Sequence, residues 1–181
     1  YTIFDRQNNW ETLIFNKFAK NYVEFFIKSK LFLKNPLLFK NLFTLLELNF
    51  LKFSHLNYST FCIQFYVEYI QTFSSFMIIR QGLIELANSR NGIFVVISAL
   101  RGYTDERNLI LLDDILSFLE VFCNGTYSST LMENVFLNYT EYSAKYLLDY
   151  KKEFIFEIIS NSNGNFIIQK LINVMKPCYF K

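Results

Sequence analysis

Tyr58-Ser59-Thr60-Phe61-Cys62-Ile63-Gln64 is the first of four similar stretches that decide the fold of this chain. The pattern returns as Gly92-Ile93-Phe94-Val95-Val96-Ile97, as Tyr127-Ser128-Ser129-Thr130-Leu131-Met132-Glu133 and as Gly164-Asn165-Phe166-Ile167-Ile168-Gln169. The intervals between their last residues, Gln64, Ile97, Glu133 and Gln169, are 33, 36 and 36 residues. A period of about 20–50 residues in a helix-patterned chain indicates a solenoid, in which each unit buries its apolar face on its neighbours. Such a surface is usually used for binding rather than for chemistry.

Helical periodicity extends over most of the chain. From Trp10 to Ile27, apolar residues recur at steps of three and four, which places them on one face of a helix. Pro36 disfavours the helical conformation at the residue before it. We therefore expect a new helix to begin near Leu37 and to present an apolar face as far as Leu51.

Short polar breaks separate the helical segments. They lie at 54–57, 88–91, 102–103, 124–125 and 160–163, and all but the third stand directly before one of the four stretches. Asn and Ser in these breaks suit helix N-caps, because their side chains accept hydrogen bonds from free backbone N–H groups. Thr104 is predicted to cap a further helix that runs to about Phe122, with Asp105 and Glu106 in its first turn. The pattern indicates three or so helices in each unit of about 36 residues.

The composition agrees with packed helices. Of the 181 residues, 52% are hydrophobic and 19% are aromatic, so the chain can bury a core and is not a disordered tail. Five Gly and two Pro are too few for a β-sandwich. No uncharged apolar run approaches the roughly 18 residues of a membrane span, so we expect no membrane among the partners.

The net charge of +2 conceals an uneven distribution. Residues 1–52 carry a net charge of +4, residues 53–150 carry −5 and residues 151–181 carry +3. The basic ends suit contact with phosphate, where Lys and Arg displace condensed counterions, although a solvated helix face explains any single lysine equally well. The acidic middle argues against a nucleic acid wrapped uniformly along the chain.

Neither the cysteines nor the histidine form a metal-binding pattern. Cys62, Cys123 and Cys178 contain no close pair, and we interpret them as reduced thiols of an intracellular protein. His55 is the only histidine, and a lone histidine cannot form a metal site by itself.

A catalytic constellation is also missing from the sequence. Asp113 and Asp114 are adjacent, so on a helix their side chains diverge by about 100° instead of converging on one substrate. The hydroxyl groups of the repeated stretches have no base in the pattern to activate them, namely those of Ser59, Ser128 and Ser129. We expect no enzyme, no cofactor and no small-molecule substrate.

The repeated stretches resemble the repeats of a known family. Asn163-Gly164-Asn165-Phe166-Ile167-Ile168-Gln169-Lys170-Leu171-Ile172 resembles the RNA-facing helix of a Pumilio repeat, and residues 127–134 resemble a looser copy. Residues 91–97, followed by Gly102 and Glu106-Arg107, and residues 124–128 are similar to the divergent nucleolar branch of that family, which is implicated in ribosome assembly. The resemblance covers roughly residues 55–175.

The resemblance implies a fold. It is all-α, a right-handed α-solenoid of three-helix Pumilio-like or armadillo-like repeats, with about five repeats in a single domain over residues 1–181. The opening on Tyr1 rather than Met suggests a fragment of a longer solenoid. A generic HEAT-like or armadillo-like array is the alternative fold.

The resemblance also implies how one base is contacted. In a Pumilio repeat, two side chains four positions apart hydrogen-bond a base edge, and the residue next to the first stacks on the base. By motif position, Asn165 and Gln169 would contact an edge, Phe166 would stack, and uracil would be preferred.

The other repeats depart from this set to different degrees. Ser129 and Glu133 would form the preceding pair, which the family associates with guanine, but Thr130 offers no flat stacking surface. The remaining two sets are Thr60 and Gln64 with Phe61, which is atypical, and Ile93 and Ile97 with Phe94, which cannot hydrogen-bond a base.

Each of these residues has a plainer interpretation. In a chain with 22 Phe, core packing is the default role for the three rings at positions 61, 94 and 166. Gln64 and Gln169 would then simply be solvated, and Gly92 and Gly164 would only permit close helix packing.

The function implied by the resemblance is RNA binding of low sequence specificity in large ribosomal subunit assembly. The partners would be RNA, ribosomal RNA in particular, with ribosomal proteins or a pre-ribosomal particle, in the nucleolus or nucleus or alternatively in the cytoplasm. One alternative is a translational regulator that reads a short messenger segment through Asn165, Phe166 and Gln169. Another is a protein-interaction scaffold without RNA, which the acidic middle and modest net charge favour.

Overall fold

The structure, a computed structural model, describes residues 7–34, 36–150 and 152–179. These residues form α-helices and one 3-10 turn (Lys152–Phe154), with no strand among them. The helices are α1 (Gln7–Ile14), α2 (Ala19–Lys28), α3 (Leu31–Lys34), α4 (Pro36–Leu48), α5 (Phe50–His55), α6 (Ser59–Tyr69), α7 (Phe73–Gln81), α8 (Leu83–Ala87), α9 (Gly92–Gly102), α10 (Glu106–Ser117), α11 (Leu119–Asn124), α12 (Ser128–Asn138), α13 (Thr140–Tyr150), α14 (Ile155–Ser160) and α15 (Ser162–Tyr179).

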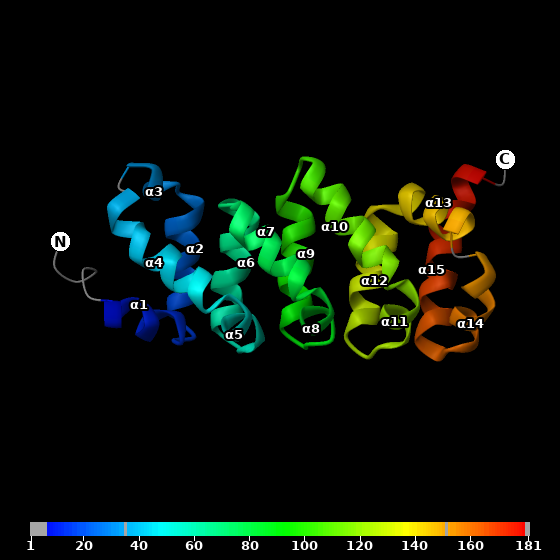
Figure 1. The fold of residues 1–181 in the computed structure, drawn as a ribbon, viewed down its shortest axis with the longest axis horizontal. Helices are drawn as coiled ribbons and strands as arrows, with labels where there is room; N and C mark the ends of the chain where they lie inside the picture. The colour runs from blue at the N-terminus through cyan, green and yellow to red at the C-terminus, as the bar shows by residue number, and fades with distance from the viewer. Residues whose placement is uncertain (1–6, 35, 151, 180–181) are drawn as a thin grey trace.

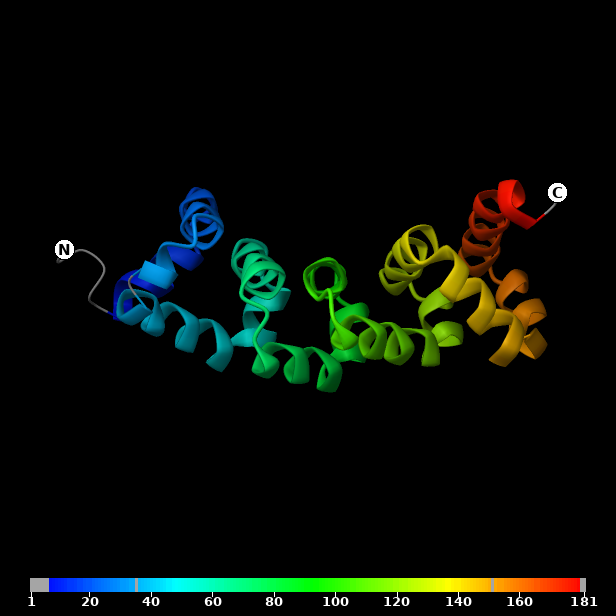
Figure 2. The ribbon, with the colours of Figure 1, turned by 90° about the horizontal axis from the view of Figure 1, so that it is seen from above.

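The helices are arranged in rows along an arc (Figures 1 and 2). The inner helices α2, α6, α9, α12 and α15 form the row on the concave side, and each packs on the next. The outer helices α4, α7, α10 and α13 form the opposite row, and the short edge helices α5, α8, α11 and α14 connect the two rows along one edge. The order outer, edge, inner recurs, so the predicted all-α solenoid of three-helix repeats is confirmed.

Two helix predictions are wrong in detail. The periodic segment from Trp10 to Ile27 is divided between α1 and α2, which are separated by residues 15–18. The helix expected to run from Thr104 to about Phe122 is two helices, because α10 ends at Ser117 and α11 begins at Leu119. Periodicity alone misses such breaks, since apolar spacing continues through them.

The predicted helix starts fare better than the predicted caps. Helix α4 begins at Pro36, one residue before the expected position. The N-cap of α10 is Asp105, whose Oδ1 accepts from the Arg107 N–H at 3.0 Å, and not Thr104. Asn161 does cap α15, since its Oδ1 accepts from the Asn163 N–H at 2.9 Å.

Asn91 also departs from its expected capping role. It precedes α9 but makes no side-chain cap hydrogen bond. Its Nδ2 instead donates to the backbone oxygen of His55 at 2.8 Å and to Asn57 Oδ1 at 3.2 Å, which joins two neighbouring repeats.

The start of the inner helix lies against the end of the edge helix before it, and in two repeats a hydrogen bond joins them. The Ser59 hydroxyl donates to the backbone oxygen of Phe53 at 2.9 Å, and the Ser128 hydroxyl donates to that of Phe122 at 3.0 Å. In both cases the acceptor lies six residues earlier. The equivalent position in the other two repeats is glycine, Gly92 and Gly164, so the first residue of this set is always Ser or Gly.

The two glycines are needed because the same carbonyl stands too close for a side chain. A Cβ on Gly92 would lie 2.6 Å from the Leu86 oxygen, and one on Gly164 would overlap the Ile158 oxygen. These oxygens again lie six residues earlier. The close-packing interpretation of Gly92 and Gly164 is therefore confirmed.

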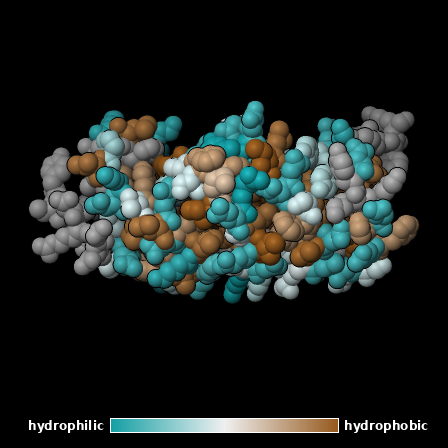
Figure 3. All heavy atoms as spheres, viewed as in Figure 1, coloured by the Kyte–Doolittle hydropathy of each residue, from teal (hydrophilic) through white to brown (hydrophobic). Residues whose placement is uncertain are grey.

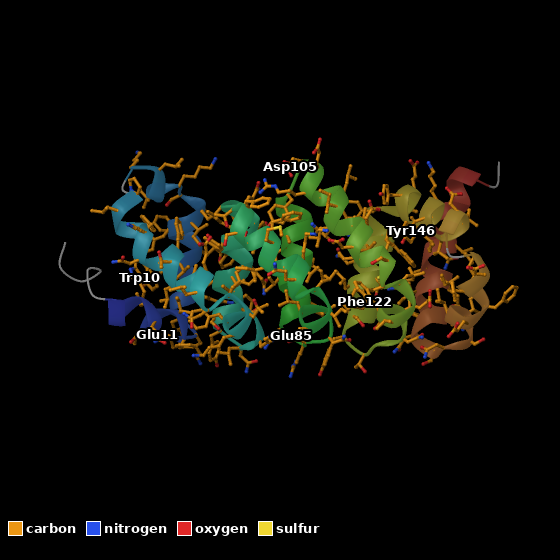
Figure 4. All side chains as sticks on the ribbon, in the orientation of Figure 1. Trp10, Glu11, Glu85, Asp105, Phe122 and Tyr146 are labelled. Atoms are coloured by element: carbon orange, nitrogen blue, oxygen red, sulfur yellow. The ribbon has the colours of Figure 1, made fainter. Side chains whose placement is uncertain are left out.

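Polar contacts join the repeats along both edges of the arc, which are marked by Glu85 and Asp105 in Figure 4. At the Glu85 edge, His55 Nε2 lies 2.8 Å from Glu85 Oε1 and His55 Nδ1 lies 2.7 Å from Ser89 Oγ. At the other edge, the Gln71 amide donates to the Gly102 oxygen at 2.6 Å, and Arg107 Nη1 donates to the Gln71 oxygen at 2.6 Å. The core between the rows is continuous and apolar, with Phe122 among its fully buried rings.

We expect Gly92→Ala to lower the free energy of unfolding by about 1–3 kcal/mol, because backbone must move to admit the Cβ. Gly82→Ala is the matched control. Its Cβ would meet chiefly Leu51 Cδ2, at 2.8 Å, and the end of a flexible side chain can move aside. Urea denaturation of both variants tests the expectation, and an equal effect in the two would contradict it.

Candidate nucleic-acid interface

The predicted contact residues occupy equivalent positions on consecutive inner helices. They are the second, third and sixth residues of α6, α9 and α12, and the same register continues on α15 from Asn165. Because these helices pack side by side, equivalent residues form rows along the concave face (Figure 2). We call the two base-edge residues of each repeat the edge positions; they are residues 60 and 64, 93 and 97, 129 and 133, and 165 and 169. We call the residue that would stack the ring position; it is residue 61, 94, 130 or 166.

The ring positions are exposed on α9, α12 and α15 and half-buried on α6. Phe94 is 45% exposed and Phe166 is 52% exposed, while Phe61 is half-buried. Core packing therefore does not account for the rings of Phe94 and Phe166. Thr130 is exposed and carries no ring, as the sequence indicates.

The edge positions on α15 present two polar groups together. Asn165 is half-buried and Gln169 is exposed, and Gln169 Nε2 donates to Asn165 Oδ1 at 3.1 Å. The two amides thus lie beside the exposed ring of Phe166, in the arrangement that contact with one base requires.

The edge positions on α6 present only one accessible polar side chain. Thr60 is 2% exposed, and its hydroxyl donates to the Asn91 oxygen at 3.4 Å. Gln64 is half-buried, and its Nε2 donates to the Thr60 hydroxyl at 3.3 Å. Of the predicted pair, Gln64 is the residue that reaches the surface.

The edge positions on α9 are buried. Ile93 is 3% exposed and Ile97 is 7% exposed. At its edge and ring positions this helix therefore offers a ring, Phe94, and no side chain that can hydrogen-bond a base.

On α12 the edge positions are already engaged. The Ser129 hydroxyl donates to the Thr126 oxygen at 3.2 Å, and Glu133 forms an ion pair with Lys170 of α15. The Glu133 carboxylate is consequently neutralised by the neighbouring helix.

Every carboxylate on the inner helices has a cationic partner. The inner helices contain three, Glu24, Glu68 and Glu133. Glu24 pairs with Lys28 at 2.5 Å and Glu68 pairs with Arg101 at 3.4 Å, alongside the pair of Glu133. The acidic excess of residues 53–150 lies on the outer and edge helices instead, at Glu85, Glu106, Asp113, Asp114, Glu120, Glu141 and Asp149.

The inner helices thus carry little of the acidic excess of residues 53–150. Their described side chains include four cations against the three carboxylates, namely Lys20, Lys28, Arg101 and Lys170. The net charges of the three sequence segments do not reveal this difference between inner and outer helices, because both kinds of helix occur in every repeat. Figure 3 shows the outer face, where hydrophilic and hydrophobic side chains are interspersed.

Sequence reasoning missed two lysines on the concave face. Lys20 occupies the second position of α2 and thus corresponds to Thr60 of α6, but α2 carries no copy of the repeated pattern. Lys170 directly follows Gln169, outside the edge and ring positions. The spacing of lysines relative to the ring positions is the signal that would have found them.

The two adjacent acidic residues Asp113 and Asp114, considered above as a catalytic pair, have different partners on the outer surface. Asp113 Oδ1 accepts from the Tyr142 hydroxyl at 2.6 Å. Asp114 accepts from Arg80 Nε at 2.5 Å and from Nη2 at 3.1 Å. They engage different helices, as their predicted divergence requires.

Among the described residues, His55 and the serine beside it have structural partners. No group of three or more His, Cys, Asp and Glu suited to a metal ion occurs in this part of the chain. Ser89, which contacts His55, also accepts from the Gly92 N–H at 3.2 Å and so satisfies a backbone N–H at the start of α9. Nor does any helix described here have the length and apolarity to cross a membrane.

Cys62 and Cys123 are buried free thiols, and burial raises the pKa of each to about 12. A thiol with so high a pKa is a poor nucleophile at neutral pH. The side chain of Cys178 lies outside the described residues.

We expect a Cys178→Ser variant to resist thiol-specific disulfide reagents at mildly alkaline pH while it is folded. In denaturant, the same variant should react at both remaining cysteines. The absorbance of the released reagent anion measures the reaction. Rapid labelling of the folded protein would contradict the burial of these thiols.

Comparisons with known proteins give a fold and no sequence relative. No protein-family model matches the chain, and no curated protein matches it in sequence. Among solved structures, it is similar to the Puf4 RNA-binding domain bound to the HO endonuclease RNA 3′ UTR recognition sequence, with a TM-score of 0.77 and 16% identity over 96% of this chain and 54% of that chain.

Two other solved structures are similar to the same extent. PUF-8 in complex with PBE-RNA matches with a TM-score of 0.75 and 15% identity, over 92% of this chain and 51% of that one. The Puf3 RNA-binding domain bound to Cox17 RNA 3′ UTR recognition sequence site B matches with a TM-score of 0.74 and 11% identity, over 96% and 49%. The chain spans about half the length of these domains, and its fold is that of the Pumilio repeat solenoid.

Proposed function

We propose that the concave face binds single-stranded RNA. The observation that carries this proposal is the set of solvent-accessible Phe rings at positions 61, 94 and 166, two of them beside polar edge residues, on a face where every carboxylate is ion-paired. Single-stranded nucleic acid is held by rings that stack on bases and by a positive surface that follows the backbone. The Puf domains of similar fold are themselves complexes with RNA, which supports the same use of this face.

The recognition that we propose has low sequence specificity. Only α15 combines an exposed ring with two accessible polar edge residues, Asn165 and Gln169. Helix α9 can stack on a base but cannot distinguish one base from another, and α12 has no ring. The set on α15 supports a preference for uracil at one nucleotide, as the resemblance implies.

The pairing of the concave carboxylates weakens the case for a protein scaffold without RNA. That alternative drew on the acidic middle of the sequence, and this acidity lies on the outer and edge helices. A protein scaffold with an apolar groove would bind with little dependence on salt. RNA binding should weaken steeply as salt rises, because phosphate contacts release counterions.

Phe166→Ala should weaken binding to a short random-sequence single-stranded RNA about 5- to 150-fold, the cost of one lost stack. Phe156→Ala is the matched control, because Phe156 is 81% exposed on the edge helix α14. Fluorescence anisotropy gives both affinities. Equal affinities of wild type and Phe166→Ala would exclude the stacking role, and no binding by wild type would overturn the proposal.

The cellular role that we propose is in assembly of the large ribosomal subunit, in the nucleolus or nucleus, with ribosomal RNA and ribosomal proteins as partners. Weak base specificity supports it, since a structured RNA in a particle is located by shape and neighbours as well as by sequence. The tagged native protein should sediment with precursor large subunits and lose this position after ribonuclease treatment. A light position that ribonuclease does not change would overturn the role.

A sequence selection separates this role from messenger regulation. RNA ligands enriched from a random pool should share at most one uracil, placed by Asn165 and Gln169. A longer consensus would instead support the translational regulator, and Gln169→Ala should then relax the position that it contacts.

A further inference from the structure

Two of the rings at the ring positions, one half-buried and one exposed, lie under a lysine ammonium group. Lys20 Nζ of α2 is 4.3 Å from the centre of the Phe61 ring, and Lys170 Nζ is 4.5 Å from the centre of the Phe166 ring. The first pair joins α2 to α6, and the second lies on α15. The two pairs therefore stand toward opposite ends of the inner row, with α9 and α12 between them (Figure 2).

The two lysines are held by weak partners. Lys20 makes no ion pair among the described residues. Lys170 pairs with Glu133, and the two side chains are 35% and 30% exposed, so solvent screens the pair. An ammonium over an exposed ring is favoured by a factor of only about 2–5. Both cations can leave their rings at small cost.

We propose that Lys20 with Phe61 and Lys170 with Phe166 form two anchors for single-stranded RNA, in which a base takes the ring and the lysine moves to the adjacent phosphate. This inference rests on the proposed function. The exchange is favourable because a phosphate contact is charge-assisted and releases a counterion, whereas the ring contact does neither. The lysine covers the ring in the free protein and holds the strand in the complex.

The two anchors also predict how far apart the two anchored nucleotides lie along the RNA strand. In a Pumilio-type repeat, one base meets each inner helix. Phe61 on α6 and Phe166 on α15 are separated by two inner helices, so the anchored nucleotides should be separated by two others. The nucleotide facing α9 would meet the Phe94 ring alone, and the one facing α12 would meet Thr130 and Glu133.

The lysine half of the proposal is tested by salt dependence. The affinity of the full chain for fluorescein-labelled oligouridylate is measured over a range of KCl concentrations. Each of Lys20→Met and Lys170→Met should make the slope of log K against log salt shallower by about 0.7, the value for one phosphate contact on a single strand. Lys170→Arg should keep the wild-type slope, and so should Lys40→Met, an exposed control on outer helix α4.

The spacing half is tested with two strands of equal length and equal charge. One carries two uridines separated by two abasic residues, and the other carries the same two uridines adjacent, both within an abasic backbone. The separated strand should bind several-fold more tightly to wild type. Phe61→Ala or Phe166→Ala should remove this difference, because only one anchor remains.

The outcomes separate the inference from the proposed function. If wild type binds oligouridylate and both Met variants keep its slope, the lysines do not contact phosphate and the anchors are wrong. If the two abasic strands bind equally, the spacing is wrong and the bases are held independently of the anchors. If wild type binds no RNA, the proposed function itself fails. Thermal unfolding of each variant confirms that a changed affinity does not reflect a changed fold.

Discussion

The rest of the structure depends on the contact between one residue at or near the start of α6, α9, α12 and α15 and a carbonyl oxygen six residues earlier. Ser59 and Ser128 satisfy that oxygen with a hydroxyl, and Gly92 and Gly164 leave room for it. A larger side chain can do neither. Because the contact fixes how the inner helix leaves the edge helix, it sets the direction of the inner helix in these four repeats. The ring and edge positions follow within two turns of it, so their alignment along the concave face is a consequence of this backbone constraint.

Once the inner helices are aligned, their charges decide what the concave face can bind. A carboxylate left unpaired on this face would repel phosphate at short range, where screening by salt is least effective. Glu68 and Glu133 are each paired by a cation on the next inner helix, and Glu24 by a cation one turn along its own helix. Two of these pairs also join neighbouring repeats. The same interactions therefore contribute to the packing of the solenoid and remove the negative charge from its inner surface, while the acidic excess lies elsewhere.

The repeated pattern was sufficient to predict the solenoid and the equivalence of the ring positions, and Pro36 was sufficient to predict a helix restart near Leu37, because each depends on residues close in sequence. Three kinds of feature could not be predicted. Helix breaks without polar residues, such as the one between α10 and α11, leave the apolar period intact. The burial of Thr60 depends on Asn91 of the next repeat, and the neutralisation of Glu133 depends on Lys170. Finally, α2 belongs to the inner row through packing alone, since its sequence lacks the pattern.

Helix α9 shows how packing and recognition compete for the same surface. It lies between α6 and α12, and a Cβ on its Gly102 would be only 2.7 Å from the Cα of Glu68. Nine of its residues are buried, including both edge positions. Its two exposed side chains are Phe94 and Arg101. A helix so enclosed cannot keep polar groups for a base edge, since buried polar groups need partners of their own. A ring and a guanidinium need only one open face each, so both stay accessible on this helix. In the RNA-binding role that we propose, the centre of the solenoid would stack on a base and contact phosphate, because close packing leaves α9 no polar residue at its edge positions.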